Sequence, residues 1–267
     1  MGKETGISWT DATWNVARGC SKVSEGCRYC YMMRDGEKFG YDGFVVQKTK
    51  TVFDMPLKYK QTKSKCWGGN PLIFTSSLTD VFHPDIDSFR GEIWDIIRRC
   101  PHLAFQILTK RPERILQHLP DDWGDGYPNV WLGISAENDE MFRKRMFELG
   151  KVKAKVKFVS CEPLLDEIDL KYVIEKQQTG GDDRLDWVII GGESGNETGK
   201  YLYRPCKIGW MDQMVEDCKK YDVPVFVKQM GTSISKNMGM RDRAGADVRQ
   251  FPTSLQVQEF PKSYMKP

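Results

Sequence analysis

Three cysteines stand close together near the start of the chain, where their thiols can converge on one centre. Cys20, Cys27 and Cys30 fall within the stretch GCSKVSEGCRYCY, with the spacing C-x6-C-x2-C. A short loop brings such side chains together at little entropic cost. No histidine lies in this stretch, since the three histidines are His83, His102 and His118. The segment is therefore predicted to bind a metal centre through sulfur.

Two kinds of centre suit this segment. Zinc takes four ligands, commonly as two separated pairs, and a fourth would come from elsewhere, with Cys66 the nearest cysteine in sequence. Three cysteines fit better an iron–sulfur cluster that leaves one iron open. Inert thiols are the third alternative. The other cysteines are scattered and are expected to pack in the interior: Cys66, Cys100, Cys161, Cys206 and Cys218.

A second group of candidate residues follows short apolar runs along the chain. Its members are Ser76, Ser77, Asp80, Thr109, Lys110, Arg111, Ser135, Glu137, Asn138, Cys161, Glu162, Gly191, Gly192, Glu193, Lys228 and Gln229. In α/β barrels the active site lies where the strands end and the loops begin. We therefore expect these residues to line one ligand cavity, with helix capping as the alternative.

The apolar runs are the elements that must position these residues. They lie at 71–75, 104–108, 129–134, 156–160, 187–190 and 223–227, with an earlier candidate at 12–15. Their continuous apolar character is typical of strands buried on both faces. Helical patterns at 87–100, 137–149 and 208–221 lie between them. The alternation predicts an α/β fold, a partial or near-complete parallel (β/α)6–7 TIM-like barrel with an irregular C-terminal extension.

Two segments do not fit the alternation. Residues 41–70 are polar and lysine-rich and are expected to form an insertion in a barrel domain that spans 1–230. Residues 231–267 are expected to form an irregular extension packed on the barrel. The basic run at 143–157 is expected to be a solvated helix face, with contact to a phosphate backbone as the alternative.

Composition narrows the class of protein. The 267 residues are 40% hydrophobic and 29% charged, with a mean hydropathy of -0.53, which fits a globular protein. No run approaches the ~18 apolar residues of a membrane span, and the N-terminus lacks the apolar core of a secretion signal. We therefore expect a cytoplasmic protein without a membrane partner. The net charge of +3 is too small to indicate nucleic acid by itself.

The cysteine segment ends in Cys-x-aromatic-Cys, with Tyr29 directly before Cys30. It resembles the radical S-adenosylmethionine superfamily, which has a partial (βα)6 barrel, although the usual first gap there is three residues instead of six. The opening ISWTDATWN and the segments FTSSLTDVFHP, LTKRPER, WLGIS, VSCEPLL, VIIGGESG and VFVKQMG resemble an uncharacterised phage- and prophage-associated family. This second resemblance covers nearly the whole chain, from about residue 7 to residue 231.

The resemblance implies a [4Fe-4S] cluster held by Cys20, Cys27 and Cys30, with S-adenosylmethionine bound at the open iron. It implies an enzyme that cleaves this cofactor reductively, with an electron donor such as flavodoxin or ferredoxin. Tyr29 is expected beside the cluster, its backbone next to the adenine. The phage association makes a nucleic acid or nucleotide a candidate substrate.

Contacts to the cofactor are expected along the rim, from Tyr29, Ser76, Ser77, Asp80, Thr109, Lys110, Ser135, Glu137, Gly191, Gly192 and Glu193. In the superfamily a Gly-Gly-Glu sequence after the second strand holds the methionine amine. Here Gly191-Gly192-Glu193 follows the predicted sixth strand, so Ser76, Ser77 or Asp80 is expected at the methionine end, and Ser135 or Glu137 at the ribose. A plain tight turn is the alternative for the two glycines.

Charged rim residues also have two interpretations. Lys110, Arg111 and Lys228 suit a carboxylate or phosphate ligand, and pairing with Glu162, Glu193 or Asp80 is the alternative. His83 is expected to reach the cavity or to cap a helix. Cys161, Glu162 and Lys228 are the predicted catalytic residues. Cys161 would return a hydrogen atom to a product radical, with simple packing as the alternative.

Two other functions stay open at this point. One is a nucleic-acid-binding or regulatory protein without catalysis, in which zinc or a static cluster acts as a staple. The other is a barrel hydrolase or lyase that uses Glu162, Glu193 and Lys228 without redox chemistry.

Overall fold

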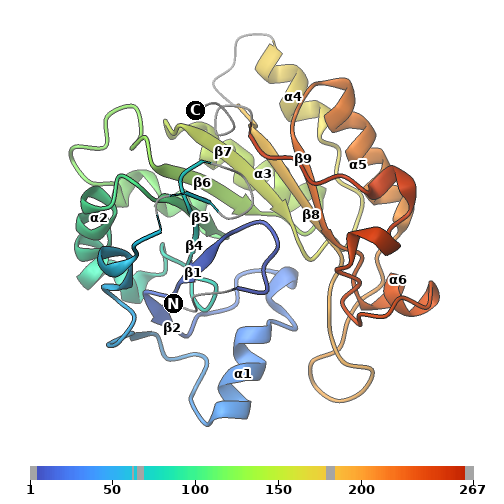
Figure 1. Ribbon diagram of the computed structural model, residues 1–267, viewed down its shortest axis with the longest axis horizontal. Helices are drawn as coiled ribbons and strands as arrows, with labels where there is room; N and C mark the ends of the chain where they lie inside the picture. Colours follow the sequence, from blue (N-terminus) through green and yellow to red (C-terminus); the bar gives the residue numbers. More distant parts are fainter. Residues whose placement is uncertain (1–4, 62, 65–68, 179–183, 262–267) are drawn as a thin grey trace.

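Seven parallel strands form the frame of the molecule in the computed structural model, which describes residues 5–61, 63–64, 69–178 and 184–261. They pair in chain order, and the sheet curls into a half-barrel, which confirms the predicted partial TIM-like barrel (Figure 1). The strands are β1 (Ala12–Trp14), β4 (Leu72–Thr75), β5 (Ala104–Thr109), β6 (Val130–Ser135), β7 (Val156–Cys161), β8 (Trp187–Gly191) and β9 (Val225–Gln229). A short antiparallel pair that the sequence did not predict joins β2 (Ala17–Arg18) to β3 (Gln47–Lys48).

In the part of the chain that the structure describes, the α-helices beside the sheet are α1 (Tyr31–Phe39), α2 (Arg90–Arg99), α3 (Asp139–Gly150), α4 (Lys171–Gln178), α5 (Ile208–Lys220) and α6 (Thr232–Asn237). Helix α5 matches its predicted range to within one residue. Helix α3 starts later than predicted because the Asn138 side chain accepts a hydrogen bond from the Met141 amide and caps the helix there. Helix α2 starts later because the stretch Pro84–Phe89 forms a 3-10 helix first. Within the described ranges, every helix is too short or too polar to span a bilayer.

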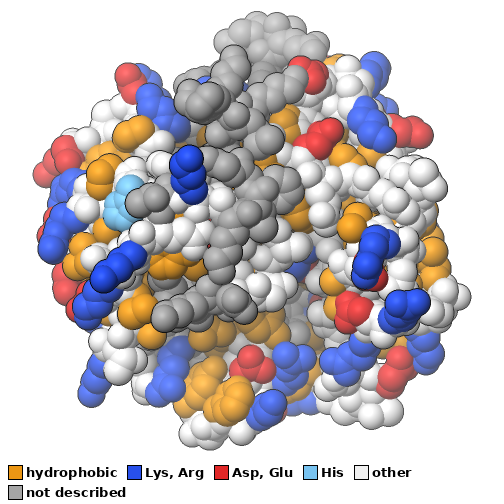
Figure 2. Space-filling view, in the orientation of Figure 1, with side chains coloured by type: hydrophobic (Ala, Val, Ile, Leu, Met, Phe, Trp, Pro, Cys, Tyr) orange, Lys and Arg blue, Asp and Glu red, His pale blue; other side chains and the backbone are white. Residues whose placement is uncertain are grey.

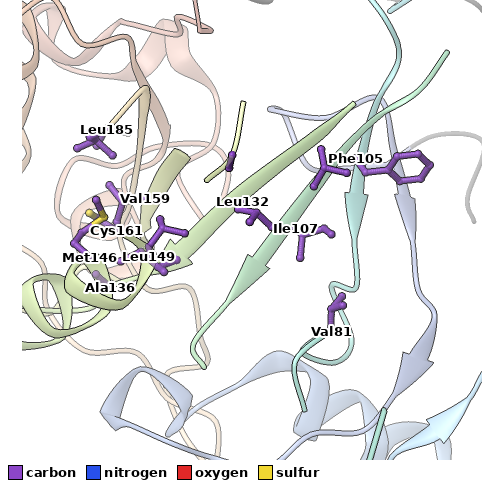
Figure 3. Packing of buried hydrophobic residues seen from close by; sticks show 14 of the residues in the cluster. Val81, Phe105, Ile107, Leu132, Ala136, Met146, Leu149, Val159, Cys161 and Leu185 are labelled. Atoms are coloured by element: carbon purple, nitrogen blue, oxygen red, sulfur yellow. The ribbon is translucent and has the colours of Figure 1, made fainter. Parts of the chain in front are cut away.

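The two faces of the sheet build two separate apolar clusters, because successive side chains of a strand point to opposite sides. The outer face packs against the helices, for example Ile107 and Leu132 in the cluster that also holds Met146 and Leu149 (Figure 3). The inner face packs on itself around Trp187, with Trp9 and Phe158 among its neighbours.

The chain after Gly231 begins with α6 and then returns along β9. The Val227 amide donates to the Val257 carbonyl, and the Glu259 amide donates to the Val225 carbonyl, so this stretch runs antiparallel to β9. Phe260 packs into the inner cluster, and Trp187 Nε1 donates to the Glu259 carbonyl over 2.8 Å. The last strand of the half-barrel is thus covered instead of left as an open edge.

Candidate functional site

The carboxyl ends of the strands bring the predicted rim residues to one end of the half-barrel. Thr109, Ser135, Cys161 and Gly191 are the last residues of their strands, and Lys228 is the last but one of β9. In the β-ladders Ser135 pairs with Ser160, and Cys161 pairs with Ile190, so neighbouring strands end at nearly the same level. The rim is therefore continuous.

Strand alternation divides these residues between the two faces of the sheet. Ser135 and Ser160 follow the inner-face residues Trp131 and Phe158, whereas Cys161 belongs to the outer cluster. Figure 3 shows Cys161 beside Val159 and Met146. Its thiol is buried there, and burial raises its pKa. This is the placement that the packing alternative expects, and it turns Cys161 away from the inner face where a product radical would lie.

Glu162 and Lys228 form an ion pair at the mouth. Lys228 Nζ lies 2.5 Å from Glu162 Oε1, and each side chain keeps a fifth of its surface exposed. Gly191 gives the Glu162 side chain room, since a Cβ at position 191 would lie 3.2 Å from the Glu162 carboxyl carbon. The pair is thus accessible to a ligand and already neutralised internally.

Asp80 and Arg111 are the centre of a buried network that reaches the cysteine segment. The Asp80 carboxylate accepts hydrogen bonds from the Thr109 hydroxyl at 2.7 Å and from the Arg111 guanidinium at 3.1 Å. Arg111 also donates to the carbonyl and hydroxyl of Ser21, both at 2.8 Å, and to Cys20 Sγ at 3.6 Å. The charges of Asp80 and Arg111 therefore neutralise each other within the protein, which favours ion pairing over ligand binding for Arg111.

Glu137 and Arg145 form a second buried pair against the same segment. Arg145 donates to Glu137 Oε2 at 2.8 Å and to the Ser24 hydroxyl at 2.9 Å, and the Gly26 amide donates to Glu137 Oε1 at 3.3 Å. Burial raises the pKa of Glu137, but Arg145 and Ser24 lower it more, so the pKa lies below its ordinary value. Glu137 is consequently a charged anchor for the loop.

Glu193 is held in the same way by Arg204. The carboxylate accepts from the guanidinium at 2.5 and 2.9 Å and from the Arg204 amide at 2.8 Å. Arg204 in turn donates to the Glu25 carbonyl at 3.0 Å, and its guanidinium lies 5.2 Å from the Tyr29 ring centre. Glu193 therefore positions Arg204, and through it the cysteine segment.

Arg111, Arg145 and Arg204, here called the three clamp arginines, come from the segments that follow β5, β6 and β8. Two of them were not predicted from the sequence: Arg145 lies in the basic run at 143–157, which was expected to be a solvated helix face, and Arg204 was not singled out. A signal was present for Arg145, because a charged residue on the apolar stripe of a helix requires a buried partner.

Lys144, Lys151, Lys153 and Lys155 of the basic run at 143–157 are exposed, as the solvated interpretation expects, whereas Arg145 is buried. Arg143 binds Asp139 and Asp169, and Lys151 binds Glu148. Lys157 is buried.

Cys20, Cys27 and Cys30 lie half-buried in the segment that these contacts hold. Cys20 and Cys30 pack against Met32 and Met33 of α1. Burial raises the pKa of Cys20 to about 11, although Arg111 lowers it. In the described part of the chain no three His, Cys, Asp or Glu side chains are placed to hold a metal ion. The donor set itself, three thiols from one short loop, is of the type that iron–sulfur clusters use. Cys66 lies outside the described residues.

Ser76 is the rim residue with unused hydrogen-bonding capacity. Its backbone has the left-handed φ of 71°, which costs a residue with a side chain about 1–2 kcal/mol. Its hydroxyl is buried and has no hydrogen-bond partner among the described residues. Ser77 differs, because its hydroxyl donates to the Asn15 amide oxygen and its carbonyl accepts from the Tyr31 hydroxyl. Buried polar groups are nearly always paired, so Ser76 is the serine that a ligand would satisfy.

Lys110 and His83 complete the rim. Lys110 is half-buried, and its charge helps to lower the pKa of Glu137. The His83 ring accepts from the Asp85 amide at 3.2 Å, which caps the 3-10 helix, and its other nitrogen lies 3.0 Å from the Ser21 hydroxyl. His83 therefore has the predicted capping role and also contacts the cysteine segment.

Gly191 and Gly192 are expected to respond differently to substitution. A Cβ at Gly192 would lie 2.2 Å from the Met230 carbonyl oxygen, whereas one at Gly191 meets only side-chain atoms at 3.2 Å or more. We expect Gly192→Ala to lower the free energy of unfolding by about 1–3 kcal/mol or more, and Gly191→Ala to have less than about a third of that effect. Urea unfolding of both variants measures this. Equal effects would contradict the prediction that the backbone contact at Gly192 makes substitution there more costly than at Gly191.

Comparison with known proteins adds a family. Residues 4–256 match the family described as protein of unknown function (DUF5131). Comparisons with curated proteins and with solved structures give no match. The match covers the strands, the cysteine segment and the three clamp arginines. The chain therefore belongs to the DUF5131 family.

Proposed function

We propose that this protein is an iron–sulfur enzyme of the radical S-adenosylmethionine type. The observation that carries the proposal is the attachment of the cysteine segment to the mouth of the half-barrel. Buried Arg111 and Arg145, from the segments after β5 and β6, and half-buried Arg204, from the segment after β8, hold Ser21, Ser24 and Glu25 there. A segment that needed only a metal staple for stability would not require two buried ion pairs and a third, partly buried one at the strand ends.

In this proposal Cys20, Cys27 and Cys30 would hold a [4Fe-4S] cluster, and S-adenosylmethionine would bind at its open iron. Such a cluster, when bound, would supply the single electron for reductive cleavage of this cofactor, with flavodoxin or ferredoxin as the donor. The unpaired Ser76 hydroxyl and the half-buried Lys110 suit the polar and anionic groups of the methionine end. Glu162 and Lys228 face a substrate above the inner cluster.

The chain's own residues also shield the site from water. Met32, Met33 and Tyr201 form an apolar cluster against Cys20 and Cys30. The Lys200 side chain contacts Glu37 of α1, so the segment after β8 closes against α1 beside this cluster. A radical reaction requires an apolar surface of this kind to exclude water, because water in the site permits side reactions.

The hydrolase alternative loses one of its three residues in the structure. Glu193 is occupied by Arg204, whereas Glu162 and Lys228 remain at the mouth. An enzyme of that kind would keep its activity after replacement of all three clustered cysteines.

Anaerobic reconstitution with iron and sulfide tests the proposal. We expect bound iron and sulfide, brown absorbance near ~400 nm, and 5′-deoxyadenosine after reduction with S-adenosylmethionine present. Cys27→Ala should abolish all three. Cys100→Ala and Cys218→Ala are matched controls, because these thiols are buried in the outer cluster, and both should retain the cluster. Zinc as the sole metal in protein purified anaerobically would contradict the proposal, as would loss of the cluster in a folded control variant.

A further inference from the structure

The lysine-rich insertion carries the positive surplus of the whole chain. Residues 48–65 contain six lysines and one acidic residue, Asp54. The complete chain has 40 Lys and Arg against 37 Asp and Glu, so the remainder is close to neutral. Such local asymmetry indicates a polyanionic partner even where the net charge of the protein is small.

Contacts at three points fix the path of this insertion along β1. The Thr49 hydroxyl donates to the Asn15 carbonyl at the end of β1, and Trp14 Nε1 donates to the Phe53 carbonyl. At the other end, the Ser64 hydroxyl lies 3.0 Å from the Asp11 carboxylate, just before β1 begins. The insertion therefore runs from the mouth of the half-barrel along the flank beside α2 (Figure 1).

Five lysines of this stretch, here called the lysine track, are exposed: Lys48, Lys50, Lys58, Lys60 and Lys63. Lys48 pairs with Glu92 and Lys58 with Asp54. For Lys50, Lys60 and Lys63 the described residues provide no ion pair. Outside residues 48–65, the 40 Lys and Arg of the chain fall by six to 34, and the 37 Asp and Glu fall by one to 36. Figure 2 shows side chains of both signs interspersed over the face turned to the reader.

The side chains between the lysines favour one class of partner. Between Lys48 and Lys63, Leu57 is the one large apolar side chain of the described residues that is exposed, at 36%, whereas the exposed Phe44 and Val45 of the insertion precede the lysines. A protein partner would need an apolar centre in the interface, and a membrane surface would need apolar anchors. A phosphate backbone needs neither, because it is bound through cations that release its counterions.

We propose that the lysine track binds the phosphate backbone of a nucleic acid and guides it toward the mouth of the half-barrel. This binding does not depend on the cluster. If the proposed enzyme function also holds, the nucleic acid bound by the lysine track is the substrate class of that enzyme.

Fluorescence anisotropy with labelled DNA tests the proposal. The probes are a single strand of ~20 nucleotides and the corresponding duplex, titrated between about 50 and 200 mM KCl. Five phosphate contacts give a slope of log K against log salt of about -3.5 for the single strand and about -4.5 for the duplex. The triple variant Lys50→Ala, Lys60→Ala, Lys63→Ala should reduce the slope by about 2–3 and weaken binding at least about tenfold at the lower salt.

The matched control removes the same charge from the helical side of the molecule. Lys144, Lys219 and Lys220 are exposed on α3 and α5, and their replacement by alanine should leave the slope unchanged. Equal losses in both triple variants would overturn the proposal, as would absence of DNA binding at the lower salt. Preference for polyglutamate or for anionic phosphatidylserine vesicles over DNA would also overturn it. Cys27→Ala should retain DNA binding, which separates failure of the track from failure of the cluster.

Discussion

Glu137→Ala is expected to lower the free energy of unfolding by about 3–5 kcal/mol, because it leaves the Arg145 guanidinium charged and buried without its carboxylate. In the intact pair the side chains are 1% and 5% exposed, and the two charged atoms lie 2.8 Å apart. The same substitution removes the acceptor for the Gly26 amide in the cysteine segment. Urea unfolding followed by circular dichroism measures the loss.

Two comparisons make this result specific. Lys236→Ala, which removes one member of an exposed ion pair with Glu197, should change stability little. The pH dependence supplies the second comparison. Since the folded pKa of Glu137 is below its ordinary value of 4.5, the stabilisation is present above that pH and is lost as the pH falls through the folded pKa. The acid side of the stability profile should therefore be flatter in Glu137→Gln. A profile identical to that of the unmodified protein would contradict this assignment.

Asp80→Ala is expected to have an effect of the same size for a related reason. Asp80 accepts hydrogen bonds from Thr109, from Arg111 and from the amides of Phe82 and Lys110. Its loss leaves Arg111 as an unpaired buried charge, which costs about 3–5 kcal/mol. Because Arg111 also holds Ser21 and Cys20, alkylation of Cys20 by iodoacetamide in the folded protein should become faster.

A double-mutant cycle separates the ion pair from simple loss of packing. Arg111→Met in the Asp80→Ala background removes the stranded charge, so the double variant should be more stable than the sum of the single losses predicts, by at least about 1 kcal/mol. Additive losses would mean that the two residues act independently. Faster alkylation in Lys236→Ala would mean that the thiol readout is not specific for the network.

The order and direction of the strands could be predicted from the sequence. Strands buried on both faces have continuous apolar sequences, such as WVII before Gly191. This pattern lies within a few neighbouring residues, so it can be recognised without the tertiary structure. Helix α5 was predicted nearly to its ends because its apolar spacing is regular. The short elements β2, β3 and α6 carry too few residues for a pattern to emerge.

The cysteine spacing and the rim position of the polar residues were likewise properties of the sequence, whereas the use of each rim residue was decided by the tertiary structure. Whether Glu193 meets a ligand or Arg204 depends on the packing of a long loop after β8. Whether Arg145 is solvated or buried depends on Glu137 and also on Ser24, which lies 121 residues away in the chain. The face on which Cys161 lies depends on the pleat of β7 in its ladder with β8. Local sequence patterns report burial and backbone preference, but an ion pair or an inward side chain is fixed only when distant segments meet in one register.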